Sequence, residues 1–113
     1  MNSPATSDLD ATMRALADGN RRAILVLVRD QALAVGEIAD RAALSQQTVS
    51  HHLRVLRGAG LVTERRHGTR HLYAVRADGL AVVRDFLDGF WPAHLVALKR
   101  AAEAAAKGGA GDA

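Results

Sequence analysis

The feature that most restricts how this chain can fold is one helical segment with a clear start and a clear end. Ser45 is a good N-cap, because its hydroxyl can accept a hydrogen bond from a backbone amide of the first helical turn. We expect the helix to run to about Arg57, since Gly58 and Gly60 follow it and end it. A shorter helix is predicted over Val35–Ala42, and the very short connection between the two predicts a helix-turn-helix.

The residues after this helix predict a two-stranded hairpin. We expect strands over Leu61–Arg66 and Thr69–Val75, with a tight turn at His67-Gly68, where glycine supplies the positive φ that such turns need. This turn would place Arg65 opposite Arg70, and facing like charges destabilise a hairpin unless an anion compensates them. A basic hairpin directly after a helix-turn-helix is a wing.

One face of the helix that follows Ser45 is apolar. At about 100° per residue, Val49, Leu53 and Leu56 fall together, and we expect this face to pack against the preceding helices. His52 lies toward the packed side and is predicted to be a hydrogen-bonded structural histidine. His51, one residue earlier, faces outward.

The opposite face of the same helix is polar and carries no acidic residue. Glutamine can pair with adenine and arginine with guanine, so the helix is predicted to lie in the major groove of DNA, with an ordinary polar surface as the alternative. The outward set is Gln46, Gln47, Ser50, His51 and Arg54. The full set of predicted DNA contacts is Ser45, Gln46, Gln47, Thr48, Ser50, His51, Arg54, Arg57, Arg65, Arg66, His67, Arg70 and His71.

Positive charge is concentrated in one third of the chain. Residues 45–76 contain six arginines and one acid, Glu64, for a balance of +5, whereas the rest contains nine basic and eleven acidic residues, for a balance of −2. Such a concentration is typical of an anion-binding surface, although a solvated face is the simpler explanation. We expect the arginines of the wing to contact the DNA backbone or minor groove and to supply salt-dependent affinity.

Further helices are predicted on both sides of this region. Before it, a first helix is indicated by Leu9, Met13 and Leu16 at helical spacing, and Asp18 is a suitable cap for a second. From about Asp78 the chain is again predicted to be helical, and Pro92 predicts either a kink or a restart. The apolar stripe of this last part favours self-association over a purely intramolecular core. The predicted dimer-interface residues are Leu9, Met13, Leu16, Leu80, Val83, Leu87, Phe90, Trp91, Leu95 and Leu98.

Length and composition indicate one domain and exclude several classes of protein. The 113 residues fit a single domain, expected over residues 8–106, with disordered tails at 1–7 and 107–113. The absence of cysteine excludes disulfides and thiolate metal sites. No apolar run reaches the roughly 20 residues that span a membrane, and no secretory signal is visible, so we expect a cytoplasmic protein without membrane contact. The sequence shows no arrangement of a nucleophile and a base, so we expect that the protein is not an enzyme.

Residues 45–62, SQQTVSHHLRVLRGAGLV, strongly resemble the ArsR/SmtB group of bacterial winged-helix repressors. The resemblance extends over LADGNRRAIL before them and ERRHGTRHLYAV after them, and it covers roughly residues 10–100. It implies a mainly α fold with a small β-hairpin wing. It also implies a homodimer formed by the first and last helices, which binds a palindromic operator and represses a promoter until an effector weakens binding.

The chain departs from the best-known members of this group at their metal sites. Those members use a cysteine pair on the third helix, whose counterpart here, VGEIADRA, contains neither cysteine nor histidine. A second family site uses Asp and His on the last helix, and the candidates Asp85, Asp88, His94 and Glu103 do not reproduce its spacing. We therefore expect no metal ion and no other cofactor.

Two alternatives stay open. The aromatic residues Phe86, Phe90 and Trp91 would suit a small organic effector bound at the dimer interface, although a plain dimer core is the favoured explanation of them. A winged helix can also serve as a protein-interaction module that never contacts DNA.

Overall fold

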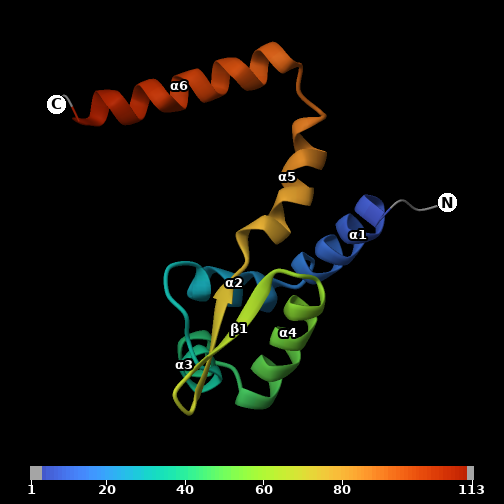
Figure 1. Cartoon of the computed structure of the whole chain (residues 1–113), viewed down its shortest axis with the longest axis vertical. Coiled ribbons are helices and arrows are strands. Elements are labelled where there is room, and N and C mark those ends of the chain that lie inside the picture. Colours follow the sequence, from blue (N-terminus) through green and yellow to red (C-terminus); the bar gives the residue numbers. More distant parts are fainter. Residues whose placement is uncertain (1–3, 112–113) are drawn as a thin grey trace. The chain divides into compact units, whose positions relative to one another are not determined.

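The computed structural model describes the backbone of residues 4–111 and the side chains of residues 8–95 and 97–107. It is mainly helical with one two-stranded antiparallel hairpin, which confirms the predicted fold class (Figure 1). The elements in chain order are α1 (Pro4–Leu16), α2 (Gly19–Arg29), α3 (Val35–Ala42), α4 (Gln46–Gly58), β1 (Val62–His67), β2 (Arg70–Val75), the 3-10 helix η1 (Ala77–Leu80), α5 (Ala81–Asp88) and α6 (Ala93–Gly111).

The chain divides into two compact units between Val83 and Arg84. The first unit contains the helix-turn-helix and the hairpin, and the second contains α6 and most of α5. We expected one domain over residues 8–106, whereas the described chain has these two units. The buried apolar cluster explains the division, because its members lie between Ala15 and Val62.

Helical structure extends into both segments that we predicted to be disordered tails. Helix α1 begins at Pro4, a residue that suits the first helical turn because its missing amide hydrogen would have no partner there. Helix α6 continues to Gly111, since the alanine-rich run before the terminal glycines favours helix. Residues 1–3 and 112–113 of the predicted tails lie outside the described residues.

The core of the first unit is built around α4. Val49, Leu53 and Leu56 are at most 2% exposed, which confirms the predicted packed face of this helix. The cluster that buries them is contributed by α1, α2, α3, β1 and the connections beside them. Its other members are Ala15, Ile24, Leu25, Val28, Leu33, Ile38, Ala39, Leu61 and Val62.

The turn between α3 and α4 is made by very few residues. Helix α3 spans the residues that we predicted, and Ala43 follows it in the left-handed conformation, with φ at 55°. The backbone amides of Ala43 and Leu44 both donate to the carbonyl of Ala39, the second at 3.0 Å. Ser45 then caps α4 as predicted, because its hydroxyl accepts a hydrogen bond from the amide of Thr48 at 3.1 Å.

The register of the hairpin differs from our prediction. Arg65 lies opposite Leu72, and Arg70 lies opposite His67, so the predicted pairing of two arginines is wrong. The loop consists of Gly68 and Thr69, because Gly68 takes the first central position of the turn, with φ at 65°. The shift by one residue removes the like-charge opposition from which we argued for a compensating anion.

A third segment joins the hairpin at its other edge. The amide of Leu33 donates to the carbonyl of Tyr73 at 3.0 Å, and the amide of Tyr73 donates to the carbonyl of Leu33 at 2.8 Å. Strand β2 therefore lies between β1 and the connection that leads from α2 to α3. This backbone pairing attaches the hairpin to the helix-turn-helix.

The second unit contains a helix break at the predicted proline. Helix α5 ends at Asp88 and α6 begins at Ala93, directly after Pro92, so the proline marks a restart and not a kink. The carbonyl of Pro92 accepts a hydrogen bond from the amide of Leu95 at 3.0 Å, in the first turn of α6. Of the predicted dimer-interface residues, Val83 and Leu87 lie within α5, whereas Phe90 lies beyond its end.

Candidate nucleic-acid interface

The outward face of α4 consists of polar side chains in water. Gln46, Gln47, Ser50, His51 and Arg54 are all exposed, opposite the buried face that fixes the helix in the core. No acidic residue lies on α4. The face that we predicted for base contacts is therefore presented to solvent as a continuous set of hydrogen-bonding groups.

Two predicted contacts at the start of α4 are already engaged within the helix. The hydroxyl of Ser45 donates to Oγ1 of Thr48 at 2.8 Å while it accepts from the Thr48 amide. Ser45 is exposed and Thr48 is half-buried. Both hydroxyls still have acceptor lone pairs, but their first role in the structure is to begin α4.

The two adjacent histidines of α4 lie in different environments, as predicted. His52 is 7% exposed and is hydrogen-bonded to Arg21, whereas His51 is exposed. Their ring centroids are 5.6 Å apart and the ring planes are tilted by 53°. Only His51 is placed to reach a DNA molecule bound along the outward face.

The wing presents five basic or imidazole side chains to solvent. Successive residues of a strand point to opposite faces, so the register puts Arg66 and His71 on one face and Arg65 on the other. Arg65, Arg66, His67, Arg70 and His71 are all exposed. They belong to the same compact unit as α4, and β1 is in contact with that helix.

A glutamate on β1 is hydrogen-bonded to two of the residues that we predicted to contact DNA. Glu64 accepts a hydrogen bond from Nη1 of Arg57 at 2.7 Å and another from Nδ1 of His71. These contacts hold the pKa of the Glu64 carboxyl below its usual value, first through the hydrogen bond from His71 and then through the positive charge of Arg57. The end of α4 is thereby joined to both strands of the wing.

A second glutamate joins the turn of the wing to α3. Glu37 accepts a hydrogen bond from the amide of Ala34 at 3.0 Å, as part of the cap of α3, and it also pairs with Nη2 of Arg70. The hydrogen bond from Ala34 is the main reason why the pKa of the Glu37 carboxyl is lowered, and the charge of Arg70 adds to it. The tip of the hairpin lies beside α3 in Figure 1.

The arginines of the predicted interface thus fall into two groups. Arg57 and Arg70 are paired with the two glutamates, and Arg76 lies 3.3 Å from Asp78. Among the side chains that the structure describes, Arg54, Arg65 and Arg66 have no acidic partner. The sequence did not identify Glu37 and Glu64 as parts of this site. Glu37 is 33 residues from Arg70, and no local sequence pattern indicates a pair at that separation.

The predicted dimer-interface residues are distributed over both units. In the first unit, Met13 is 38% exposed, while Leu9, Leu16, Leu80 and Val83 are half-buried. The exposed fractions in the second unit are 43% for Leu87, 67% for Phe90, 52% for Trp91, 44% for Leu95 and 65% for Leu98. Large apolar side chains with so much exposed surface are typical of residues that a partner covers.

Two other kinds of site are not found among the described residues. No three His, Asp or Glu side chains in this part of the chain lie close enough together to hold a metal ion. None of the described helices is long and apolar enough to cross a membrane. The absence of a cofactor stays a prediction.

The helix pair α3–α4 and the basic hairpin that follows it define a winged helix-turn-helix. A helix-turn-helix domain family matches residues 16–65 of the chain. The HTH-type transcriptional regulator Rv2034 of Mycobacterium tuberculosis is 48% identical over 82 residues, which are 73% of this chain and 77% of that protein. The HTH-type transcriptional regulator NmtR of the same organism is 35% identical over 85 residues, 75% of this chain and 71% of that protein. The chain belongs to the ArsR/SmtB family of helix-turn-helix transcriptional regulators.

A solved structure supports the same assignment. The homodimeric winged helix-turn-helix DNA-binding domain from Mycobacterium bovis, determined by solution NMR, matches with a TM-score of 0.60 at 33% identity. The match covers 78% of this chain and 88% of that domain. The family resemblance and the winged-helix fold predicted from the sequence are both confirmed.

We predict that Glu64→Gln lowers the free energy of unfolding at neutral pH and that this effect shrinks as the pH falls. The pKa of Glu64 is lower in the folded than in the unfolded chain, where 4.5 is usual, so its carboxylate stabilises the fold above that value. The contribution is lost as the pH falls through the lowered pKa. Urea unfolding of both proteins, followed by circular dichroism from neutral pH down to about pH 3, measures the difference.

A carboxylate of the second unit provides the control for this experiment. Glu103 is exposed, and within the described part of the chain its one ion-pair partner is Lys99, with Nζ at 3.9 Å from Oε1. Glu103→Gln should leave the unfolding free energy nearly unchanged across the range, as is usual for exposed pairs. A Glu64→Gln difference that stayed constant with pH would contradict the role given to the Glu64 carboxylate.

Proposed function

We propose that this protein is a transcriptional repressor that binds a palindromic operator in duplex DNA as a homodimer. The observation that carries the proposal is the division of α4 into a fully buried face and an exposed face of acid-free polar side chains. Such a helix can enter the major groove with its first turns at the base edges. A repressor of this kind acts in the cytoplasm, where the bacterial chromosome lies.

The side chains of the exposed face match the hydrogen-bonding patterns of bases. Gln46 and Gln47 stand in the first turn of α4 and can each donate to and accept from adenine. Arg54 stands two turns later and can donate two parallel bonds to guanine. Ser50 and His51, between them, can bond to bases or to phosphates.

The wing supplies contacts that do not depend on base sequence. Arg65 and Arg66 are exposed, and neither has an acidic partner among the described side chains, so both can approach phosphates without breaking an ion pair. Arg57 and Arg70 are already neutralised by glutamates. We therefore assign the salt-dependent part of DNA affinity mainly to Arg65 and Arg66, and the positioning of the wing to the paired residues.

We predict that the unpaired and the paired arginines differ in their effect on salt dependence. Arg65→Ala should weaken binding to promoter and random DNA alike, and it should reduce the slope of log affinity against log salt by about 0.9 for each phosphate that the protein no longer neutralises. Arg57→Ala should leave the slope nearly unchanged, because Arg57 bonds to Glu64. Fluorescence anisotropy with a labelled duplex from the protein's own promoter, at several salt concentrations, measures both.

The same titrations test the repressor proposal as a whole. Wild-type protein should prefer its promoter duplex to a random duplex by about a thousandfold or more at physiological salt. Equal affinity for the two duplexes would overturn the proposal. If the winged helix instead served only to bind another protein, Arg54→Ala and Arg65→Ala would leave binding to that protein intact.

We also propose that the exposed apolar side chains of the second unit form the dimer interface together with α1. The Mycobacterium bovis domain of the same fold is homodimeric. Phe86 and Phe90 pack edge to face with their ring centroids 5.1 Å apart, and Trp91, Leu95 and Leu98, further along the second unit, are exposed as well. A homodimer would remove these side chains from water, which is strongly favourable.

We predict that Leu98→Glu shifts the protein to a monomer, because a buried carboxylate without a partner is costly at an apolar interface. Sedimentation equilibrium should show a dimer for wild type and a monomer for the variant. Ala104→Glu adds the same charge to another side of α6 and should leave the dimer intact. A dimeric Leu98→Glu protein would exclude this face from the interface.

A second candidate function, the sensing of a small organic acid, is favoured by a hollow in the second unit. Trp91 and Leu95 form its apolar part, and Arg84, Lys99 and Arg100 stand around them together with Asp88 and Glu103. Each of the three cations lies beside an acid, at 3.3 Å for Arg84 and Asp85, 3.9 Å for Lys99 and Glu103, and 3.5 Å for Arg100 and Asp88, so a carboxylate ligand would have to replace one of these partners. All three pairs are exposed and therefore weak, and an apolar surface beside exchangeable cations suits a planar ligand that carries a carboxylate. Such a ligand would weaken operator binding if it altered the dimer.

We predict that an aromatic carboxylate, with benzoate as the probe, changes the fluorescence of Trp91 in a saturable manner. Trp91 is the single tryptophan of the chain, so tryptophan fluorescence reports on its surroundings in the second unit. Cyclohexanol, which is apolar but uncharged, is the control ligand. Unchanged fluorescence at millimolar benzoate would contradict the sensing role for this class of ligand and leave the dimer proposal untouched.

A further inference from the structure

The buried histidine of α4 connects the proposed recognition helix to the rest of the first unit. His52 is next to His51 and two residues before Arg54, yet its own side chain is 7% exposed and cannot reach DNA from the packed side. Nδ1 of His52 lies 3.4 Å from Nη1 of Arg21. An arginine side chain only donates, so Nδ1 of His52 is the acceptor of this bond.

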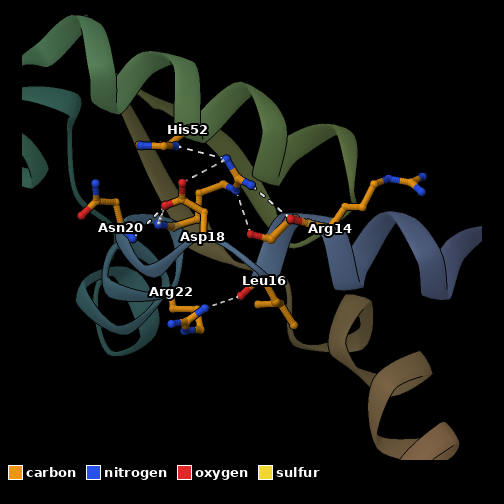
Figure 2. A network of polar contacts seen from close by, with 8 residues as sticks. Arg14, Leu16, Asp18, Asn20, Arg22 and His52 are labelled. Carbon is orange, nitrogen blue, oxygen red and sulfur yellow. Dashed lines mark hydrogen bonds and ion pairs between the residues drawn. The ribbon is translucent and has the colours of Figure 1, made fainter.

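The same guanidinium group closes the end of α1. Nε of Arg21 donates to the carbonyl of Ala15 at 2.7 Å, and Nη2 donates to the carbonyl of Arg14 at 3.1 Å (Figure 2). The last carbonyls of a helix have no partners within the helix, so these bonds satisfy groups that would otherwise need water. The side chain of Arg21 is 15% exposed, which keeps the arrangement largely dry.

An acidic residue holds the guanidinium group from a third direction. Asp18 caps α2 by accepting from the amides of Asn20 and Arg21, at 2.8 and 3.2 Å, and its other oxygen lies 3.9 Å from Nη1 of Arg21. The cap bond from the Arg21 amide is the main cause that lowers the pKa of Asp18. One planar group therefore joins the end of α1, the start of α2 and the middle of α4, as Figure 2 shows.

We infer that Arg21 and His52 are positioning residues for DNA recognition, which set the rotation of α4 about its axis relative to α1. The inference rests on the proposed DNA-binding function. The burial of its apolar face decides which side of α4 faces water, but apolar contacts are non-directional and fix the rotation less finely than a hydrogen bond does. The bond between Arg21 and His52 is directional and attaches to the residue next to His51, so a change in it rotates the outward side chains away from the base edges.

A neighbouring arginine separates this role from simple capping of α1. Nη1 of Arg22 donates to the carbonyl of Leu16 at 2.7 Å, so it also caps the end of α1, and among the described residues it makes no hydrogen bond to α4. If capping alone mattered, Arg22 and Arg21 would be equivalent. If the link to α4 matters, only Arg21 and His52 affect the reading of bases.

The experiment compares variants that keep or remove the acceptor at residue 52. His52→Asn keeps an oxygen near the position of Nδ1, whereas His52→Leu keeps the apolar bulk without an acceptor. Arg21→Lys removes the planar group that reaches α1 and α4 together, and Arg22→Ala is the capping control. The affinity for the promoter duplex and for a random duplex is measured at one salt concentration, together with the thermal midpoint of each variant.

The ratio of the two affinities distinguishes positioning from general loss of structure. His52→Leu and Arg21→Lys should lower the promoter-to-random ratio by about tenfold, the effect of one misread base pair, while binding to random DNA changes little. His52→Asn should restore most of the ratio, and Arg22→Ala should leave it unchanged even if its thermal midpoint falls.

Other outcomes overturn the inference. A His52→Leu protein with the wild-type ratio, or with equal losses on both duplexes, shows that the link does not position the helix. A wild-type protein without preference for its promoter overturns the proposed function itself and is recognised before any variant is compared. If His52→Leu does not fold, the comparison of Arg21→Lys with Arg22→Ala gives the same decision.

Discussion

The burial of one face of α4 is the interaction on which the rest of this structure depends. Val49, Leu53 and Leu56 are almost completely removed from water, and each fully buried side chain of this kind contributes roughly 1.5–3 kcal/mol. Positions on a helix are related by a constant rotation, so the same burial decides where every other side chain of α4 points. The exposed polar face that we propose as the base-contacting surface is a direct consequence of how the core is packed.

Backbone pairing and charge attach the wing to this core. The reciprocal hydrogen bonds between Leu33 and Tyr73 join β2 to the chain ahead of α3, while Glu37 and Glu64 each bridge a helix to the hairpin. Exposed ion pairs contribute little to stability. Their larger consequence is to neutralise some arginines of the basic segment and to leave others available for an anion. The net charge of the segment therefore overstates the number of phosphate contacts that it can make.

The parts of this structure that depend on short stretches of sequence were predictable, and those that depend on a register or on distant residues were not. The cap at Ser45 and the burial of His52 follow from residues within one or two helical turns. The hairpin register was predicted one residue away from its position, because a glycine suits more than one place in a tight turn. The partner of His52 is 31 residues away, and no local pattern reveals such a contact. The predicted DNA contacts are exposed in the structure except for Thr48, which is half-buried, and their contacts with DNA stay predictions.

The sequence by itself determined the order of the elements, the apolar and polar faces of α4, and the basic character of the region that follows. These features are local, since they arise from helical periodicity, from capping residues and from the order of charges along the chain. Only the tertiary structure decided which arginines are neutralised by glutamates and how α1 is linked to α4 through Arg21. The physical reason is that hydrogen bonds and ion pairs act over a few ångströms, so their partners are chosen by the packing of the folded chain.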